Sequence, residues 1–110
     1  MDVREKKRLE AAGWRVGTAE DFLGLDAAEA ALVEVKLGLS QALRARRTAK
    51  HLSQAQLAKR LGSSQSRVAK MEAADQSVSL DLLLRGLLVL GATPRDVAKL
   101  IRDAGARVAA

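Results

Sequence analysis

Two neighbouring segments, 54–61 and 64–72, each place their apolar residues three or four positions apart. This spacing is typical of the buried face of an α-helix, because a strand would instead alternate with a period of two. Gly62 lies between the segments and predicts the end of the first helix. We therefore expect two short helices joined by a tight turn. Their inward residues are Leu57, Ala58, Leu61, Val68 and Met71.

The sequence on either side of this pair also favours helices. Ala and Leu are abundant, β-branched residues are sparse, and side chains that cap helix N-termini precede the apolar runs. Gly38 predicts a break or kink inside the long run 27–50. The fold class we predict is all-α: a five-helix domain over 39–104, a short helical N-terminal extension over 1–38, and a frayed tail over 105–110. The expected N-caps are Asp26, Ser53, Ser64, Ser79 and Thr93.

Segment 80–90, LDLLLRGLLVL, is apolar nearly all round. Leu82 and Val89 lie opposite its main apolar stripe, with Gly86 near them, so something has to cover this second side. A second copy of the chain would make these three residues a homodimer contact, whereas the N-terminal segment folded over them would leave a monomer. The pattern leaves both arrangements open. In the last helix, the residues expected to face inward are Val97, Leu100 and Ile101.

The net charge of +6 is concentrated in the middle of the chain. Residues 35–72 carry nine Lys or Arg against one acid, whereas residues 1–34 carry five against eight. A basic stripe of this kind attracts a polyanion through phosphate contacts and counterion release. A merely solvated basic surface has the same composition and is the plainer alternative.

Other function classes find little support in the sequence. The chain has no cysteine and a single histidine, and it shows no paired carboxylates, nucleophile elbow or phosphate-binding glycine loop, so we expect neither an enzyme nor a metal or cofactor site. Its first ten residues offer no signal peptide, and Arg85 interrupts the longest apolar run. That run is also shorter than the roughly 18 residues of a membrane span. We expect a soluble, cytoplasmic protein.

The second helix of the pair crowds small, hydrogen-bonding and cationic side chains at its start. With its apolar edge facing the core, Ser66, Ala69 and Lys70 point outward, while Gln65 and Arg67 lie on the flanks. A helix held at a steep angle can enter the DNA major groove, where Gln pairs with adenine, Arg with guanine and Ser with either. A solvated helix face is the alternative. The predicted base-reading residues are Gln65, Ser66, Arg67, Ala69 and Lys70.

The stretch LSQAQLAKRLGSSQSRVAKMEAAD resembles the helix-turn-helix of the phage Cro/CI-repressor superfamily, the XRE-type regulators. With its flanking helices, the resemblance covers roughly residues 39–103. Ser63 departs from the pattern, since this superfamily often has an apolar residue there. The resemblance implies a homodimer on double-stranded operator DNA, with half-sites about 34 Å apart. It also implies an internal ion pair between Arg47 and Glu72. The residues we expect on DNA phosphates are Gln54, Ser53, Ser64, Lys59, Arg60 and Arg46.

The acidic N-terminal extension leaves three hypotheses open about the function of the protein. A chain of this length, with GWRVGTAEDFLGL ahead of the motif, is similar to antitoxins of the HigA type, whose partners are basic RelE/HigB-like endoribonuclease toxins. Trp14 and Phe22 are then candidates for docking the toxin, or else simply pack the extension onto the core. A stand-alone or prophage repressor is the second hypothesis. A protein-interaction module that keeps the fold without binding DNA is the third.

Overall fold

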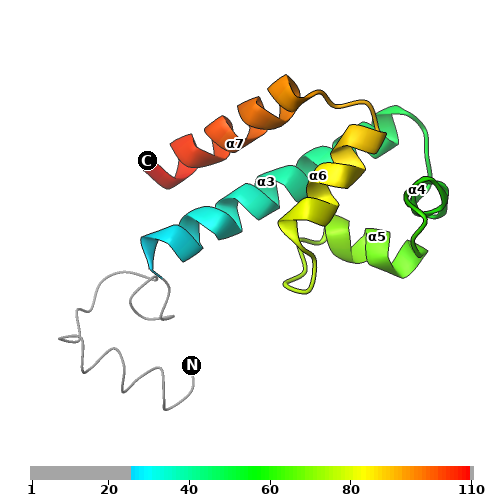
Figure 1. Ribbon diagram of the computed structural model, residues 1–110, viewed down its shortest axis with the longest axis horizontal. Coiled ribbons are helices and arrows are strands. Elements are labelled where there is room, and N and C mark those ends of the chain that lie inside the picture. Colours follow the sequence, from blue (N-terminus) through cyan, green and yellow to red (C-terminus); the bar gives the residue numbers. More distant parts are fainter. Residues whose placement is uncertain (1–25, 110) are drawn as a thin grey trace, which may run out of the picture. The chain divides into compact units, whose positions relative to one another are not determined.

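The computed structural model describes residues 26–109, and in that range the helices are joined by turns, without a strand. They are α3 (Ala27–Ala49), α4 (Gln54–Leu61), α5 (Gln65–Glu72), α6 (Leu80–Val89) and α7 (Pro94–Ala109) (Figure 1). The all-α, five-helix prediction is therefore confirmed. The contacts divide the chain into two units, Met1–Val33 and Glu34–Ala110. Of the first unit, the structure describes residue 26 and the opening turns of α3.

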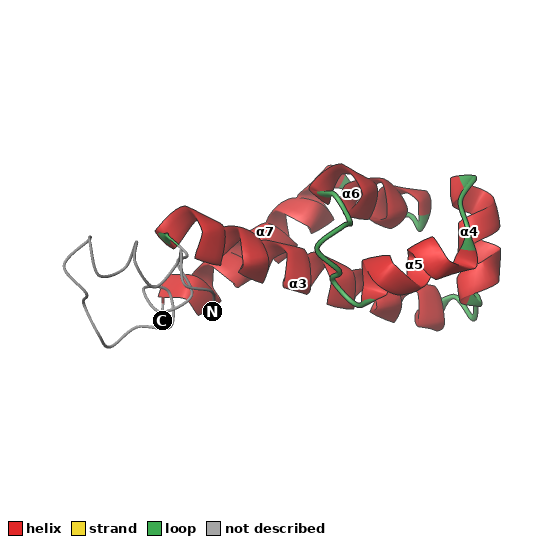
Figure 2. Ribbon diagram, turned by 90° about the horizontal axis from the view of Figure 1, so that it is seen from below, coloured by secondary structure: helices red, strands yellow, loops and turns green. Residues whose placement is uncertain are grey.

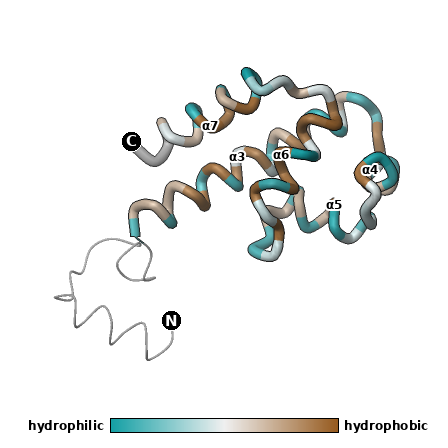
Figure 3. Tube along the Cα trace, viewed as in Figure 1, coloured by the Kyte–Doolittle hydropathy of each residue, from teal (hydrophilic) through white to brown (hydrophobic). Residues whose placement is uncertain are grey.

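The second unit packs α4, α5 and α6 around the C-terminal half of α3. α4 and α5 lie side by side in both views, and α7 lies away from α5 (Figures 1 and 2). Apolar stretches recur along α3, α6 and α7 (Figure 3). The inward residues expected of α4 and α5 are all buried, as predicted from their spacing. The largest fully buried side chains include Leu39, Leu43, Leu57, Val68, Met71, Leu83, Leu87 and Leu90.

Gly86 lies on the buried side of α6 and not with Leu82 and Val89 on the second side, where we placed it. A Cβ atom built at this position would lie 3.0 Å from Leu43 Cδ1 and 3.0 Å from Met71 Cε. The absence of a side chain therefore lets α6 approach α3 and α5 closely. On a helical wheel Gly86 lies about 40° from both Leu82 and Leu90, so angle alone left it on the border between the two sides.

Two further predictions about helix faces and ends need correction. α7 continues to Ala109, through the residues expected to form a frayed tail. A single Gly105 costs roughly 1 kcal/mol relative to Ala, which the Ala-rich sequence around it outweighs. Ile101 was expected to face inward but is 40% exposed, whereas Val97 and Leu100 pack against the core. In addition, α3 runs through Gly38 without interruption.

Side-chain caps begin the helices at the predicted residues. Ser53 and Gln56 form a complete capping box at α4, in which each side chain bonds the other's backbone N–H. Thr93 and Asp96 form the same box at α7. Asp96 N donates to Thr93 Oγ1 at 3.1 Å, and Thr93 N donates to Asp96 Oδ2 at 2.9 Å. The hydroxyls of Ser64 and Ser79 accept N–H groups in the first turns of α5 and α6. These caps satisfy donors that the helices themselves leave without partners.

The C-terminal ends of α3, α4, α5 and α6 share one geometry. In each, a residue with positive φ follows the helix, and two backbone N–H groups turn back to carbonyls of the last turn. After α4, for example, Ser63 N donates to Ala58 O at 2.8 Å and Gly62 N to Lys59 O at 3.2 Å. Glycine occupies the positive-φ position after α4 and α6. His51 (φ 57°) and Ala74 (φ 54°) occupy it after α3 and α5.

This difference predicts opposite effects of substitutions at equivalent positions. A side chain at positive φ costs about 1–2 kcal/mol, part of which glycine offsets by its freedom in the unfolded chain. His51→Gly and Ala74→Gly are therefore expected to raise the free energy of unfolding by about 0.5–1 kcal/mol. Gly62→Ala is expected to lower it by about 1 kcal/mol, although a Cβ there meets no atom within 4 Å. Urea denaturation measures the free energy of unfolding of all three variants. If all three substitutions changed it in the same direction, the backbone explanation would be contradicted.

Candidate nucleic-acid interface

α5 presents a polar and cationic face to solvent while its opposite edge is fixed in the core. Val68 and Met71 are fully buried. Ser64 anchors the start of the helix, because its Oγ accepts the N–H of Arg67 at 3.2 Å. Four of the five predicted base-reading residues are exposed, and Ala69 is half-buried. The exposed residues are Gln65, Ser66, Arg67 and Lys70.

The ion pair that fixes the other end of α5 is the one implied by the resemblance. Arg47 of α3 donates from Nε to Glu72 Oε2 at 2.5 Å and from Nη2 to Oε1 at 3.0 Å. Arg47 Nη1 also donates to the carbonyl of Leu52, at 2.7 Å, in the loop before α4. Gln54 Nε2 donates to Glu72 Oε1 at 3.2 Å. This Arg47–Glu72–Gln54 network therefore ties α3, the α3–α4 loop, α4 and α5 to one carboxylate.

The network is largely shielded from water and keeps Glu72 ionised. The side chains of Arg47 and Glu72 are 12% and 5% exposed. Burial raises the pKa of Glu72, but hydrogen bonds from Arg47 and Gln54, with the charge of Arg47, outweigh it and leave the pKa lowered. The hydrogen bond to Glu72 raises the pKa of Arg47 in turn. The acid at the end of α5 is thus neutralised internally and adds little repulsion towards a polyanion.

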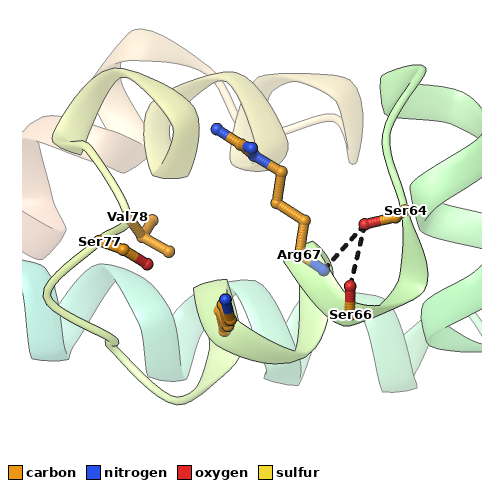
Figure 4. A pocket seen from close by; sticks show the side chains of 6 residues that line it. Ser64, Ser66, Arg67, Ser77 and Val78 are labelled. Carbon is orange, nitrogen blue, oxygen red and sulfur yellow. Dashed lines mark hydrogen bonds between the residues drawn. The ribbon is translucent and has the colours of Figure 1, made fainter.

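A hollow of about 270 Å³ lies between α5 and the loop that leads to α6 (Figure 4). Sequence reasoning missed Ser77, which lines it from this loop. Ser77 donates its N–H and its hydroxyl to Asp75 Oδ1, at 2.8 and 2.6 Å, in an Asp-initiated turn. The signal in the sequence was the Asp-x-Ser spacing directly after the helix. The hollow is lined by Ser64, Ser66, Arg67, Lys70, Ser77 and Val78.

Five of the six predicted phosphate-contacting residues lie on α4 or at the turns that begin α4 and α5. Gln54 is half-buried, and its amide is oriented by Glu72. The hydroxyls of Ser53 and Ser64 serve as helix caps. The exposed members of the set are Ser53, Lys59, Arg60 and Ser64.

Arg46 has a different neighbour from the one we expected. Its Nη2 donates to Asp96 Oδ2 of α7 at 3.1 Å, so it links α3 to α7. Hydrogen bonds from Thr93, with the charge and hydrogen bond of Arg46, lower the pKa of Asp96. Because this pair is 35% and 44% exposed and screened by water, Arg46 remains a proposed phosphate contact that would exchange Asp96 for the DNA. The sequence missed the pair because its members are 50 positions apart.

The candidates for protein contacts are only partly described. Leu82 is half-buried and packs against the core, while Val89 is 37% exposed. Leu88, which the sequence did not single out, is 49% exposed beside it. Trp14 and Phe22 lie outside the described residues. In the part of the chain that the structure describes, no cluster of His, Cys, Asp or Glu is placed to hold a metal ion.

Comparison with protein families now identifies the arrangement. A helix-turn-helix family model matches residues 43–97, which span the C-terminal part of α3 to the first turn of α7. Neither the curated proteins nor the solved structures gave a match. Residues 26–109 contain no helix that is both long and apolar enough to cross a membrane. The family match covers half of the chain, and we conclude that the protein belongs to the XRE-type helix-turn-helix family of DNA-binding regulators.

Proposed function

We propose that the protein is a sequence-specific transcriptional repressor that reads the major groove of its operator with α5 and represses its own operon. The observation that carries this proposal is the contrast between the two sides of α5. One side is fixed by the core and by the Arg47–Glu72–Gln54 network, whereas Gln65, Ser66 and Lys70 are exposed. Side chains held this way suit hydrogen bonding to base edges. We accordingly place the protein in the cytoplasm, beside its DNA target.

Binding to DNA from the protein's own promoter tests this function directly. The affinity would be compared with that for a scrambled duplex at several salt concentrations, because phosphate contacts make both affinities fall with salt. Promoter-selective binding supports the repressor. Equal, salt-insensitive binding to both duplexes would refute it and favour a protein-interaction module that keeps the fold.

Individual residues are expected to differ in how they contribute to selectivity. Gln65→Ala should weaken operator binding by about 1–3 kcal/mol and relax the preference at one base pair, since a bidentate contact to a base is lost. Lys59→Ala should weaken binding to all duplexes alike and reduce the salt slope by about one. Fluorescence anisotropy with single-base-pair operator variants distinguishes the two patterns. Identical behaviour of both variants would contradict the division into reading and positioning residues.

We further propose that the protein acts as a homodimer. A single recognition helix buries little surface, and regulators of this kind place two copies on half-sites about one helical turn apart. The exposed Leu88 and Val89 at the end of α6 are the candidate contact. Sedimentation of the protein alone and with a two-half-site duplex gives the number of copies, and a single bound copy would refute the dimer.

An antitoxin role is the second candidate function. It is favoured by the acidic excess of residues 1–34, which complements a basic RelE/HigB-like toxin. Co-expression with the product of the neighbouring gene tests it. A stable complex that inhibits a ribonuclease supports the antitoxin, whereas selective operator binding without any such complex leaves a stand-alone or prophage repressor.

A further inference from the structure

We propose that the hollow between α5 and the α5–α6 loop receives one phosphate group of the DNA backbone, and that Arg67 binds this phosphate instead of reading a base. The inference rests on the proposed function, because it concerns the same contact with DNA. It reassigns Arg67, which the sequence pattern grouped with the base-reading residues. It also makes the α5–α6 loop one wall of the DNA contact.

Arg67 lies on the side of α5 that borders the hollow. Val68 and Met71 face the core, so Ser66 and Lys70 point outward, whereas Arg67 lies on the flank towards the α5–α6 loop. Figure 4 shows its side chain extending away from Ser64 and Ser66, while Ser77 and Val78 lie across the hollow from these two serines. A helix in the major groove has base edges in front of it and sugar-phosphate backbones beside it. Gln65, the first residue of α5, still meets base edges because the N-terminal end of a recognition helix enters the groove. The cation of Arg67, on the flank beside the α5–α6 loop, meets a backbone first.

The hollow is lined by hydrogen-bond donors that an anion can use. Within the described residues, neither Arg67 nor Lys70 forms an ion pair. Ser64 Oγ lies 3.2 Å from Ser66 Oγ and already accepts the N–H of Arg67. Its proton can therefore go to Ser66, which leaves the hydroxyl of Ser66 free to donate outward. Two cations and a hydroxyl thus surround a space much larger than the roughly 30 Å³ of a water molecule.

The carboxylate of Asp75, two residues before Ser77, is not among the residues that line the hollow. The N–H and the hydroxyl of Ser77 both donate to its Oδ1. These hydrogen bonds, helped by the nearby charge of Lys70, lower its pKa. Ser77 therefore holds Asp75 within its own turn. The carboxylate stays ionised, and the two positive charges of Arg67 and Lys70 in the lining outweigh its single negative charge.

The test separates a phosphate contact from a base contact through Arg67→Ala and Arg67→Lys. If Arg67 binds a phosphate, Arg67→Ala should weaken binding to the operator and to every single-base-pair variant by the same factor, roughly tenfold. It should also reduce the salt slope by about one. Arg67→Lys should recover most of the affinity, because lysine binds phosphate as a point charge but cannot replace a bidentate contact to guanine.

The matched control is Lys99→Ala, which removes the same charge from α7, away from α5. It should leave both the affinity and the salt slope nearly unchanged. Circular dichroism of all three variants checks that they fold as the wild type does, as the exposure of Arg67 and Lys99 leads us to expect.

Three results would overturn the inference. If the wild type selects its promoter but Arg67→Ala relaxes a single base pair and Arg67→Lys fails to recover binding, Arg67 reads a base and only the inference fails. If the wild type selects no sequence at any salt concentration, the proposed function itself fails. A free phosphate is the other source of the same group. The hollow would be assigned to free phosphate by two results together. Inorganic phosphate would shift the amide resonances of Ser66 and Ser77 saturably, and both Arg67 variants would bind the operator as tightly as the wild type does.

Discussion

Replacing Glu72 with alanine is expected to lower the free energy of unfolding by about 3–5 kcal/mol. The substitution leaves the guanidinium of Arg47, whose side chain is 12% exposed, without its carboxylate, and it removes the acceptor of the Gln54 amide. A buried charge without a partner costs far more than the intact pair contributes. Since a domain is typically stable by 5–15 kcal/mol, much of its stability would be lost. Urea denaturation at neutral pH measures the effect.

Arg46→Ala provides the control, because the Arg46–Asp96 pair is 35% and 44% exposed. Water screens such a pair, so its loss is expected to cost less than about 1 kcal/mol. If Glu72→Ala and Arg46→Ala lowered the free energy of unfolding by similar amounts, burial would not explain the strength of the network. A large loss of DNA affinity in a still-folded Glu72→Ala would instead show that the network positions α5.

The same carboxylate predicts how stability depends on pH. The pKa of Glu72 is lowered from its ordinary value of 4.5 in the folded protein, so folding favours the ionised form. Its contribution is therefore complete above the unfolded pKa and is lost as the pH falls through the lower folded value. We expect the wild type to lose stability below about pH 4.5 more steeply than Glu72→Gln does. Parallel pH profiles would contradict this assignment.

Gly86→Leu is expected to destabilise the fold by about 3 kcal/mol or more, because it overpacks the contact among α3, α5 and α6. The first atom of the new side chain would already lie 3.0 Å from carbons of Leu43 and Met71. The remaining atoms would have to displace α6. Thermal denaturation, compared with the wild type, measures the loss.

The same substitution at Gly105 separates packing from helix propensity. Nothing lies within 4 Å of a Cβ at Gly105, so Gly105→Leu should stabilise α7 by up to about 1 kcal/mol. A folded, wild-type-like Gly86→Leu would contradict the close approach of α6. It would also reopen the question of whether this residue faces a partner.

Much of the fold could be predicted because local rules decide it. The capping box of Ser53 and Gln56, the N-cap of Ser64 and the positive φ of Gly62 each depend on side chains and backbone within one turn. Local rules were less informative where a residue breaks its usual preference. The residue types of His51 and Ala74 do not predict a positive φ, because the turn that ends each helix imposes this angle.

The sequence by itself thus determined that the chain is helical, where α4 and α5 begin and end, and which polar residues α5 shows to solvent. Only the tertiary structure decided that Gly86 is buried, that Arg46 turns to Asp96, and that Ser77 borders a hollow beside α5. The physical reason is the same in each case. Periodicity tells which side of one helix faces inward, whereas a partner on another helix is set by distance and angle between elements far apart in the sequence.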